Sequence, residues 1–394
     1  MTKDYKLASL NRISPAVLET LPSRLTLTED AQLADAWLVR SAHLHHQELP
    51  EDLLAIARAG AGVNNIPLQP SAELGIVVFN TPGANANAVA ELVLAVMIAG
   101  SRNLPQALKW MGSLSPETED LAGRVESQKN DYVGREIRGR SLGVIGLGAV
   151  GHRVANAAAA LGMEVYGYDP YIPIEFAWKI SSRVHRSEQL EDMLPMCDFV
   201  SVHVPLTDAT RHLINVEAVS RMKAEAILLN YARDGLVDEA AVKVALEAGR
   251  LGGYRSDFPT ALNLTFPNTI VTPHLGASTL ESEENCAVMA VEELRDYLLH
   301  GNISNSVNFP AVALGVPRYP TRLVILHRNK PNALNRMTAL FGEAGYNIET
   351  MVSNSRGDYA CALIDLRDAI DAGFALQLQE YPDILRVRVI APAF

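Results

Sequence analysis

The sequence predicts an α/β protein with two doubly wound parallel-sheet domains and a smaller ferredoxin-like module of βαββαβ order at its C-terminal end. Three observations predict this class. Short, almost continuously apolar runs alternate with helix-like segments, which is typical of parallel strands covered by helices on both faces. One of these runs leads through a glycine-rich turn into a helix. After residue 320 the alternation gives way to a compact block in which two neighbouring strands are expected to pair.

The length and composition indicate a soluble protein of two or three domains. The chain has 394 residues, of which 48% are hydrophobic and 20% charged. Its 34 basic and 45 acidic residues give a net charge of −11, which disfavours nucleic acid as a partner because the chain would repel a phosphate backbone. The longest apolar stretch, residues 92–99, is far below the roughly 20 residues of a membrane span. We therefore expect no membrane association.

The cysteines and the N-terminal residues favour a cytoplasmic protein. Cys197, Cys286 and Cys361 lie far apart with no CxxC pair, which argues against a disulfide framework or a metal site. The first ten residues lack the apolar core of a signal peptide. A reducing cytoplasm fits both observations best.

Seven apolar runs are the candidate strands of the two parallel sheets. They are residues 36–40, 76–80, 141–146, 164–169, 199–204, 226–230 and 269–273, and helix-like segments lie at 87–102, 150–161, 239–247 and 280–300. The two long helical segments, 87–102 and 280–300, bracket the block that contains the glycine-rich turn. This is expected when one domain is inserted into another. We predict a discontinuous first domain of residues 1–90 and 282–310, and an inserted domain of residues 91–281.

The glycine-rich turn has the spacing of a dinucleotide-binding site. Gly146, Gly148 and Gly151 follow a strand in G-x-G-x-x-G spacing, and a helix opens at the third glycine. The first glycine permits a tight turn, the second lets the backbone approach a pyrophosphate, and the third lets helix and strand pack closely. Asp169 ends the next strand, where its carboxylate can bind ribose hydroxyls and repel a 2′-phosphate. The pattern predicts a Rossmann domain that binds NAD rather than NADP. The alternative is a packing turn followed by a surface aspartate.

Two candidate chemical residues follow later strands of the same domain. Arg233 comes just past the strand at 226–230, and His274 follows the strand at 269–273. Ligands of open α/β sheets bind at the carboxyl ends of the strands, so both side chains are expected beside the dinucleotide. An arginine can hold a substrate carboxylate, and a histidine can take a hydroxyl proton while a hydride leaves the same carbon. Each residue alone would be read as a surface salt bridge or a loop histidine.

The C-terminal part differs from the rest in its composition and in its pattern of apolar residues. Residues 309–320 hold three prolines without periodicity, which predicts a linker. The block that follows, residues 320–394, is predicted to have the order βαββαβ of a ferredoxin-like module. It is too short to house a reaction centre of its own, and we expect it to sense a small molecule.

The chain resembles the D-isomer-specific 2-hydroxyacid dehydrogenases that carry a C-terminal ACT domain. The matching segments are AGAGVNNIP (59–67), FNTPGANANAVAELVL (79–94), VIGLGAVG (144–151), HVPLTDATRHLI (203–214), NYARDGLVD (230–238) and PHLGAST (273–279). The resemblance implies a flavodoxin-like substrate domain with an inserted Rossmann domain. Within the family, the chain resembles the branch that oxidises 3-phosphoglycerate to 3-phosphohydroxypyruvate with NAD, at the start of serine biosynthesis. A homodimer or homotetramer is also expected.

Roles for individual residues follow from the resemblance. His274 corresponds to the acid/base of the family and Arg233 to its carboxylate-binding arginine. The cofactor is expected to contact Gly146, Gly148, Ala149, Val150, Gly151, Asp169, Tyr231, Ala232, Asp257, Gly276 and Ala277. The substrate is expected to contact Arg40 through its phosphate and Gly62, Val63 and Asn64 through its carboxylate. Lys129 is a further expected substrate contact, on the ground of its charge and not of the resemblance.

The sequence departs from the family pattern near the predicted site. Relatives pair the catalytic histidine with a glutamate, yet no glutamate lies between Asp257 and His274. Ala42 stands where a second phosphate-binding arginine is common, and Asp234 replaces a usual glycine. Lys129 and the nearby Arg135 offer compensating positive charge, although a solvated charged surface explains them equally well.

The C-terminal module resembles an ACT domain that binds a small amino acid, which makes serine the expected effector. His327, Asn329 and Asn347 stand where serine-regulated relatives place ligand contacts. Asn332 is a departure, because the family commonly has glycine there for close backbone approach. A purely dimerising module is the alternative.

Two other functions stay open at this point. One is a dehydrogenase or reductase for another D-2-hydroxy acid, against which Arg40 argues because an unphosphorylated substrate needs no cation there. The other is a non-catalytic NAD-sensing binding protein, which the missing glutamate favours.

Overall fold

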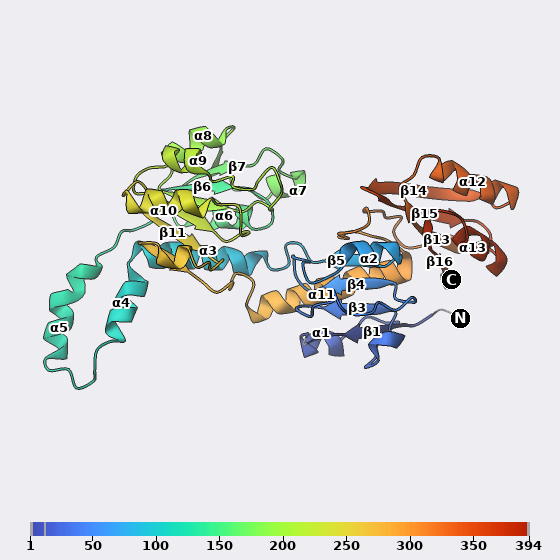
Figure 1. Cartoon of the computed structure of the whole chain (residues 1–394), viewed down its shortest axis with the longest axis horizontal. Coiled ribbons are helices and arrows are strands. Elements are labelled where there is room, and N and C mark those ends of the chain that lie inside the picture. Colours follow the sequence, from blue (N-terminus) through green and yellow to red (C-terminus); the bar gives the residue numbers. More distant parts are fainter. Residues whose placement is uncertain (1–2, 12, 392–394) are drawn as a thin grey trace. The chain divides into compact units, whose positions relative to one another are not determined.

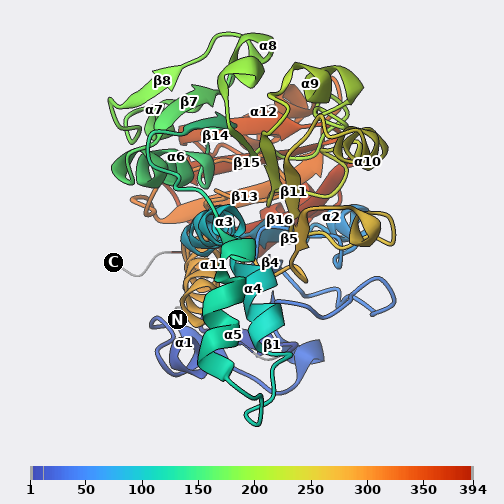
Figure 2. The ribbon, with the colours of Figure 1, turned by 90° about the vertical axis from the view of Figure 1, so that its left-hand side faces the viewer.

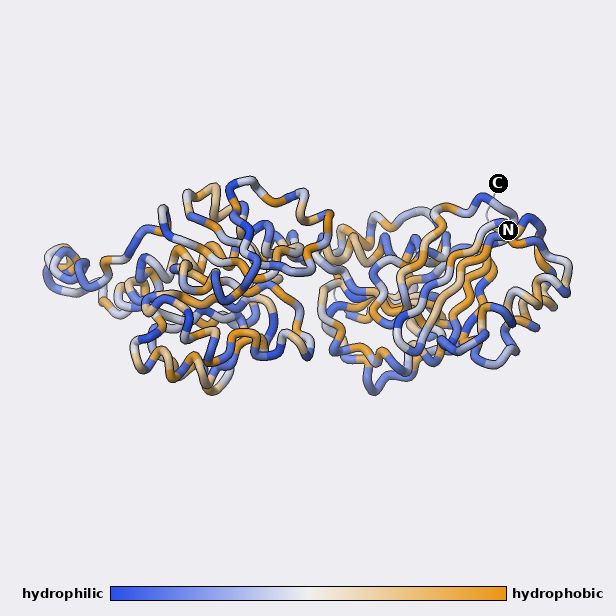
Figure 3. Tube along the Cα trace, turned by 90° about the horizontal axis from the view of Figure 1, so that it is seen from above, coloured by the Kyte–Doolittle hydropathy of each residue, from blue (hydrophilic) through white to orange (hydrophobic). Residues whose placement is uncertain are grey.

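The described residues, 3–11 and 13–391 of a computed structural model, form two compact α/β units (Figure 1). The first unit is formed by Met1–Asn85 and Leu280–Phe394, and the second by Ala86–Thr279. The second unit is inserted in the sequence of the first. Figure 3 shows apolar stretches running along the strands inside each unit, as expected for sheets buried on both faces.

The first unit contains a five-stranded parallel sheet. Its strands are β1 (Tyr5–Ser9), β2 (Leu25–Leu27), β3 (Ala36–Val39), β4 (Ala55–Arg58) and β5 (Val77–Asn80), in the order β2-β1-β3-β4-β5. The helices are α1 (Pro15–Glu19), α2 (Leu68–Glu73) and α11 (Leu280–His300), with a 3-10 turn, η1 (Ala31–Leu33). Alternate residues of one strand enter different cores, since Leu38 packs in the cluster that contains α11 and Trp37 in the cluster on the other face. Each strand is therefore apolar throughout.

The second unit contains a seven-stranded parallel sheet. Its strands are β6 (Ser141–Ile145), β7 (Glu164–Tyr168), β8 (Val184–Arg186), β9 (Phe199–Val202), β10 (Ile227–Asn230), β11 (Gly253–Ser256) and β12 (Thr269–Val271). The order β12-β11-β10-β9-β6-β7-β8 reverses direction beside β6, which creates a topological switch point. In such sheets, ligands bind outside the carboxyl ends of the strands at this point.

Helices and 3-10 turns cover this sheet and extend beyond it. They are α3 (Ala86–Ser101), α4 (Leu104–Met111), α5 (Leu121–Gln128), η2 (Lys129–Tyr132), α6 (Gly151–Ala160), α7 (Ile174–Ala177), α8 (Leu190–Met193), η3 (Leu194–Met196), α9 (Val216–Arg221), α10 (Glu239–Glu247) and η4 (Asn263–Thr265). Figures 1 and 2 both show α4 and α5 as a hairpin that projects from the seven-stranded domain. Among the described residues no single helix is long and apolar enough to cross a membrane. As a pair, α3 and α4, bent by 71° at their break, do satisfy the criteria of length and composition.

The C-terminal module has the predicted βαββαβ order. Its elements are β13 (Thr321–Arg328), α12 (Ala333–Glu343), β14 (Ile348–Arg356), β15 (Tyr359–Leu366), α13 (Ala372–Gln379) and β16 (Ile384–Ile390). The strands form an antiparallel sheet in the order β14-β15-β13-β16. Together with the two parallel sheets, this module confirms the predicted fold class.

Residues 309–320, which were expected to form a linker, are instead packed into the first unit. Phe309 and Val312 are buried, and Val312 bridges to Ile303 in an antiparallel pair. One face of the module's sheet, which includes Val324 and Leu363, shares a core with helix α11. The prolines of 309–320 therefore shape a packed connection, because apolar residues between them anchor the chain.

Candidate functional site

The glycine-rich turn has the geometry that dinucleotide binding requires. Gly146 has a left-handed backbone, with φ of 87°, and helix α6 begins at Gly151. A Cβ atom at Gly151 would stand 1.8 Å from the carbonyl oxygen of Gly146, so only glycine fits there. A Cβ atom at Gly148 would meet nothing within 4 Å. The backbone at Gly148 is therefore open, which leaves a pyrophosphate room to approach the amino end of the helix.

Asp169 fixes this turn from the end of the neighbouring strand. One carboxylate oxygen accepts a hydrogen bond from the backbone N–H of Leu147 at 2.8 Å, and the other accepts one from Tyr171 at 2.9 Å. The side chain is half-buried, and each oxygen has a further lone pair for a ribose hydroxyl. The residue expected to select NAD is thus held in place by the turn itself.

Arg233 lies past the carboxyl end of β10 on a short, well-tied loop. Asn230 donates from its side-chain amide to the carbonyl oxygen of Arg233 at 3.0 Å and accepts from the backbone N–H of Ala232 at 3.3 Å. The guanidinium donates to the carbonyl of Ala232, and its residue is otherwise exposed. Tyr231 is buried beneath the loop. The arginine therefore keeps its planar edge open for an incoming carboxylate.

His274 sits on a loop that the carboxylate of Asp257 holds together. Asp257 is buried and accepts three hydrogen bonds, from the Thr272 hydroxyl at 2.6 Å and from the backbone N–H groups of Leu275 and Gly276 at 2.7 Å each. His274 itself has a left-handed backbone, with φ of 56°, an arrangement that costs free energy in a residue other than glycine. The Asp257 carboxylate offsets this cost by fixing both sides of the histidine.

The imidazole of His274 has no carboxylate beside it in the described part of the chain. Its ring meets the ring of Phe258 edge to face, with centroids 5.2 Å apart, and is exposed to solvent. The oxygens of Asp257 are engaged by the loop, so that residue positions the histidine through the backbone. This geometry agrees with the absence of a glutamate noted in the sequence.

The first unit brings a second group of candidate residues to the carboxyl ends of β3 and β4. Arg40 follows β3 and donates to Glu283 at 2.6 Å. The loop that contains Gly62, Val63 and Asn64 follows β4; the His45 ring lies 2.8 Å from the Asn64 carbonyl oxygen. These contacts fix the ends of two adjacent strands, because β3 and β4 pair directly.

Two supporting residues here were missed from the sequence. The Arg58 guanidinium lies against the 60–64 loop, so close that a Cβ atom at Gly60 would stand 2.5 Å from its Nη1 atom, and its Nε donates to the Arg40 carbonyl. Asn80 donates from its side-chain amide to the Ala61 carbonyl at 2.6 Å. A charged residue that ends a buried apolar strand was the available signal for Arg58.

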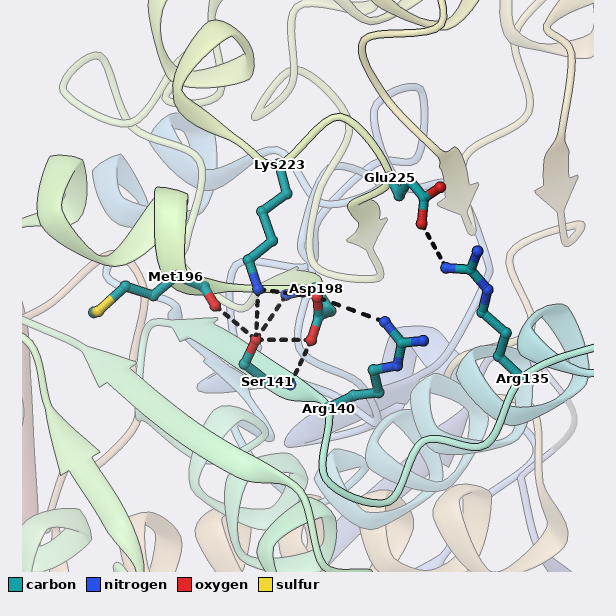
Figure 4. Close-up of polar contacts among 7 residues, drawn as sticks. All are labelled: Arg135, Arg140, Ser141, Met196, Asp198, Lys223 and Glu225. Atoms are coloured by element: carbon teal, nitrogen blue, oxygen red, sulfur yellow. Dashed lines mark hydrogen bonds and ion pairs between the residues drawn. The ribbon is translucent and has the colours of Figure 1, made fainter.

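Lys129 forms a local ion pair with Glu126, and both side chains are largely exposed. Arg135 pairs with Glu225 at 2.5 Å, before the amino end of β10 and so at the sheet edge opposite to Arg233 (Figure 4). These pairs match the solvated charged surface that was the alternative interpretation. A substrate contact for Lys129 stays a prediction.

The predicted effector residues are divided between the two ends of the C-terminal sheet: His327 and Asn329 lie at the carboxyl end of β13, and Asn347 precedes β14 at the other end, because both strands pair antiparallel with β15. His327 is buried, with Nδ1 2.9 Å from the Arg328 carbonyl oxygen and with no hydrogen-bond partner at Nε2; burial lowers the pKa of its imidazole. Asn329 donates to the Gly357 carbonyl, and Asn347 donates to Glu349. Asn332 precedes α12 with φ of 67°, the left-handed conformation that glycine adopts most readily.

Comparison with known proteins places these features in a family context. Residues 94–276 match the family model described as D-isomer specific 2-hydroxyacid dehydrogenase, NAD binding domain. The chain is 37% identical over 318 residues to a D-3-phosphoglycerate dehydrogenase of Methanocaldococcus jannaschii, covering 78% of this chain and 58% of that protein. It is 32% identical over 388 residues to the Escherichia coli protein of the same name, covering 92% and 90%.

A solved structure shares the fold over most of the chain. The NAD⁺-bound 3-phosphoglycerate dehydrogenase of Entamoeba histolytica matches with a TM-score of 0.59 and 26% identity, covering 77% of this chain and 99% of that one. The chain spans little more than half the length of several relatives, as with the archaeal protein, and nearly the full length of the Escherichia coli protein.

Proposed function

Because the chain belongs to the D-isomer-specific 2-hydroxyacid dehydrogenase family, we propose that it oxidises 3-phospho-D-glycerate to 3-phosphohydroxypyruvate with NAD, the first step of serine biosynthesis. The observation that carries the proposal is the similarity to D-3-phosphoglycerate dehydrogenases over as much as 92% of the chain. Arg58 and Arg40, the second of which also pairs with Glu283, stand at neighbouring strand ends, where a phosphorylated substrate needs cations.

NAD, when bound, supplies the acceptor for the hydride that leaves the substrate's C2 carbon. The open backbone at Gly148 leaves room for its pyrophosphate. The Asp169 carboxylate, whose oxygens each keep a lone pair after binding the backbone, can accept hydrogen bonds from its ribose. The inserted domain is an NAD-binding domain by its family match. Asp169 also repels a 2′-phosphate, which favours NAD over NADP.

His274 and Arg233 act on the substrate. In the proposed reaction, Arg233 holds the substrate carboxylate, and one nitrogen of the His274 imidazole takes the proton of the C2 hydroxyl. That proton leaves as the C2 hydride departs, so the C–H and O–H bonds are replaced by a C=O bond. Asp257 holds the His274 loop, so the ring is positioned without a direct carboxylate partner.

The test is the formation of NADH from 3-phosphoglycerate, compared with D-glycerate and D-lactate. We expect rapid turnover of 3-phosphoglycerate alone. Preference for an unphosphorylated acid would replace the proposed substrate by another D-2-hydroxy acid. NADH binding without turnover of any acid would favour an NAD-sensing protein, the function that the unpartnered His274 ring would suit.

Serine is the proposed effector, and its site is proposed between two copies of the chain, at His327 and Asn329 of one copy and Asn347 of the other. The free Nε2 of buried His327 supports it, because a buried ring nitrogen without a partner is available to a ligand. Serine inhibition of the intact enzyme that Asn347→Ala weakens would support this placement. Inhibition that Asn347→Ala leaves unchanged would place the effector elsewhere.

A homodimer or homotetramer is proposed for the active form, in the cytoplasm. The projecting α4–α5 hairpin has no buried residue of its own, and Leu104, Leu108 and Met111 are 46%, 62% and 44% exposed. A second copy of the chain is the proposed cover for this apolar surface. Sedimentation of the full chain and of Leu108→Lys tests the assembly.

The proposed cytoplasmic location is supported by the three cysteines, which are free thiols, as a reducing compartment requires.

A further inference from the structure

Phe258, in the loop that follows strand β11, packs on the imidazole of His274. The ring centroids are 5.2 Å apart and the ring planes meet at 68°. Aromatic pairs in this edge-to-face geometry attract each other at centroid distances of about 4.5 to 7 Å. His274 is exposed and Phe258 is half-buried. The phenyl ring is thus a wall on which the exposed imidazole rests.

The backbone of Phe258 is fixed on both sides by buried side chains. Its N–H donates to the Ser256 hydroxyl at 3.1 Å, and its carbonyl oxygen accepts from the Asn263 side-chain amide at 2.8 Å. Ser256 and Asn263 are each 0% exposed. Because water cannot replace a hydrogen bond that is lost in such a setting, both bonds hold the loop firmly.

Glu239 anchors Asn263 from another element of the same unit. It is the first residue of α10, and its two carboxylate oxygens accept from the Asn263 side-chain amide and from the Thr260 hydroxyl, at 2.6 Å each. Thr260 and Asn263 are also joined by two hydrogen bonds of 3.0 Å that involve their backbone N–H groups. Hydrogen bonds to a charged acceptor are stronger than neutral ones. The carboxylate therefore ties the 258–263 loop to the helix.

We propose that Phe258 and Glu239 are positioning residues for His274, and that together they replace a carboxylate partner in fixing the imidazole. Glu239 fixes Asn263, Asn263 fixes the backbone of Phe258, and the phenyl ring limits the rotation of the imidazole. Proton transfer requires a ring nitrogen within hydrogen-bond reach of the substrate hydroxyl. A ring that turned freely would therefore lower the rate without weakening substrate binding. The inference rests on the proposed role of His274.

Glu239 acts through hydrogen bonds, and its charge is not what the imidazole requires. Both of its oxygens are engaged by the 258–263 loop, and it forms no hydrogen bond or ion pair with His274. A glutamine at position 239 can accept from the Asn263 amide and donate to the Thr260 hydroxyl, which is able to accept. Glu239→Gln should therefore keep the loop in place, and Glu239→Ala should release it.

The first test is steady-state kinetics with the D-2-hydroxy acid that the full chain oxidises. Phe258→Leu and Glu239→Ala should each lower kcat by roughly three- to ten-fold, with KM and the Kd of NADH changed by less than about two-fold. Phe258→Tyr and Glu239→Gln should retain most of kcat, because the ring and the hydrogen bonds are kept. Glu247→Ala removes an exposed carboxylate of the same helix and should leave kcat unchanged.

The second test needs no activity, so it separates a failed inference from a failed reaction. In NMR spectra of the histidine-labelled full chain, the His274 ring signals, assigned with His274→Ala, should move in Phe258→Leu because the ring current of the phenyl group is lost. Signals that stay in place there, or a kcat that Phe258→Leu leaves unchanged, would overturn the inference, even if Glu239→Ala does not fold. A wild type that oxidises no acid, while the signals move as expected, would support the ring contact and contradict the proposed reaction.

Discussion

The carboxyl edges of the two parallel sheets present different kinds of groups for ligand binding. At the seven-stranded sheet, backbone geometry dominates, because Gly146 and Gly151 shape the turn and the carboxylates of Asp169 and Asp257 bind backbone N–H groups. At the five-stranded sheet, long side chains dominate, because Arg40 and Arg58 reach over the strand ends. The first edge presents a glycine turn fixed by carboxylates and one exposed imidazole, and the second presents two guanidinium groups.

This difference predicts how each edge responds to substitution. A change at the seven-stranded edge should act on chemistry or on cofactor choice, since its groups are the ones proposed to touch the reacting atoms and the cofactor. A change at the five-stranded edge should act on substrate selection or on the stability of the supporting loop.

The largest effect is expected at His274. His274→Ala should lower kcat by about 10³-fold or more, because the proton acceptor is lost while the cofactor turn is intact. Steady-state kinetics with 3-phosphoglycerate measures this loss, and NADH fluorescence titration supplies the control. A variant that kept near-normal kcat, or one that lost NADH binding in parallel, would contradict the role assigned to the ring.

Arg233→Ala should act on the substrate as well as on the rate. We expect kcat/KM to fall by about 10²-fold, with a higher KM, because the planar guanidinium that binds the carboxylate is lost. Arg233→Lys should recover only part of this loss, since an ammonium group cannot bind two carboxylate oxygens in one plane. Full recovery in the lysine variant would show that charge alone matters there.

Glu293 of α11 supports the five-stranded edge in a pH-dependent way. The Glu293 side chain is buried and accepts a hydrogen bond from the Asn305 side-chain amide at 2.6 Å. The backbone carbonyl of Asn305 in turn accepts a hydrogen bond from the backbone N–H of Asn80. The side-chain amide of Asn80 donates to the carbonyl oxygen of Ala61. Burial raises the pKa of Glu293 to about 7 from 4.5. The protonated form is therefore favoured by folding, and its contribution to stability is full below the unfolded pKa and is lost as pH rises through about 7.

Glu293→Gln should remove this dependence, because the amide accepts the same hydrogen bond without a charge. Between pH 5 and pH 8 the wild type should lose about 1–3 kcal/mol of unfolding free energy relative to the variant. Urea unfolding at both pH values measures the difference. Parallel pH profiles for the two proteins would show that Glu293 is not the group involved.

A smaller effect is expected for cofactor choice. Asp169→Ala should weaken NAD binding and narrow the preference for NAD over NADP by about ten-fold, because a ribose acceptor and a repulsive charge are both lost. Comparison of kcat/KM for the two cofactors measures it, with Asp169→Glu as the matched control. A wild type that preferred NADP would contradict the proposed role of Asp169 in selecting NAD.

The sequence predicted the seven-stranded edge far better than the five-stranded one. Glycine spacing is a backbone requirement, so it is visible in the sequence as the turn at 146–151. Arg58 left no comparable pattern, because a long side chain reaches its site through folding. Strand β11 was absent from the apolar runs chosen as strands for a related reason, since it carries Arg255 and Ser256 in a buried position.

The C-terminal connection shows a further limit of sequence patterns. Prolines in 309–320 suggested a linker, yet Phe309 and Val312 are packed into the core shared by α11 and the module. Two apolar residues among prolines carry no periodicity, so burial there depends on tertiary contacts that no local pattern reveals. The α4–α5 hairpin was likewise not predicted, since its helices bury none of their own residues.

Substrate selection at the five-stranded edge offers the most direct test of the proposed function. The measurement is kcat/KM for 3-phosphoglycerate and for D-glycerate, in the wild type and in Arg40→Ala. The wild type should favour 3-phosphoglycerate by at least about 100-fold, and Arg40→Ala should remove most of that preference while changing D-glycerate turnover less than about three-fold. A wild type that used D-glycerate equally well, or a variant that lost both substrates in equal measure, would contradict a phosphate site at Arg40 and with it the proposed reaction.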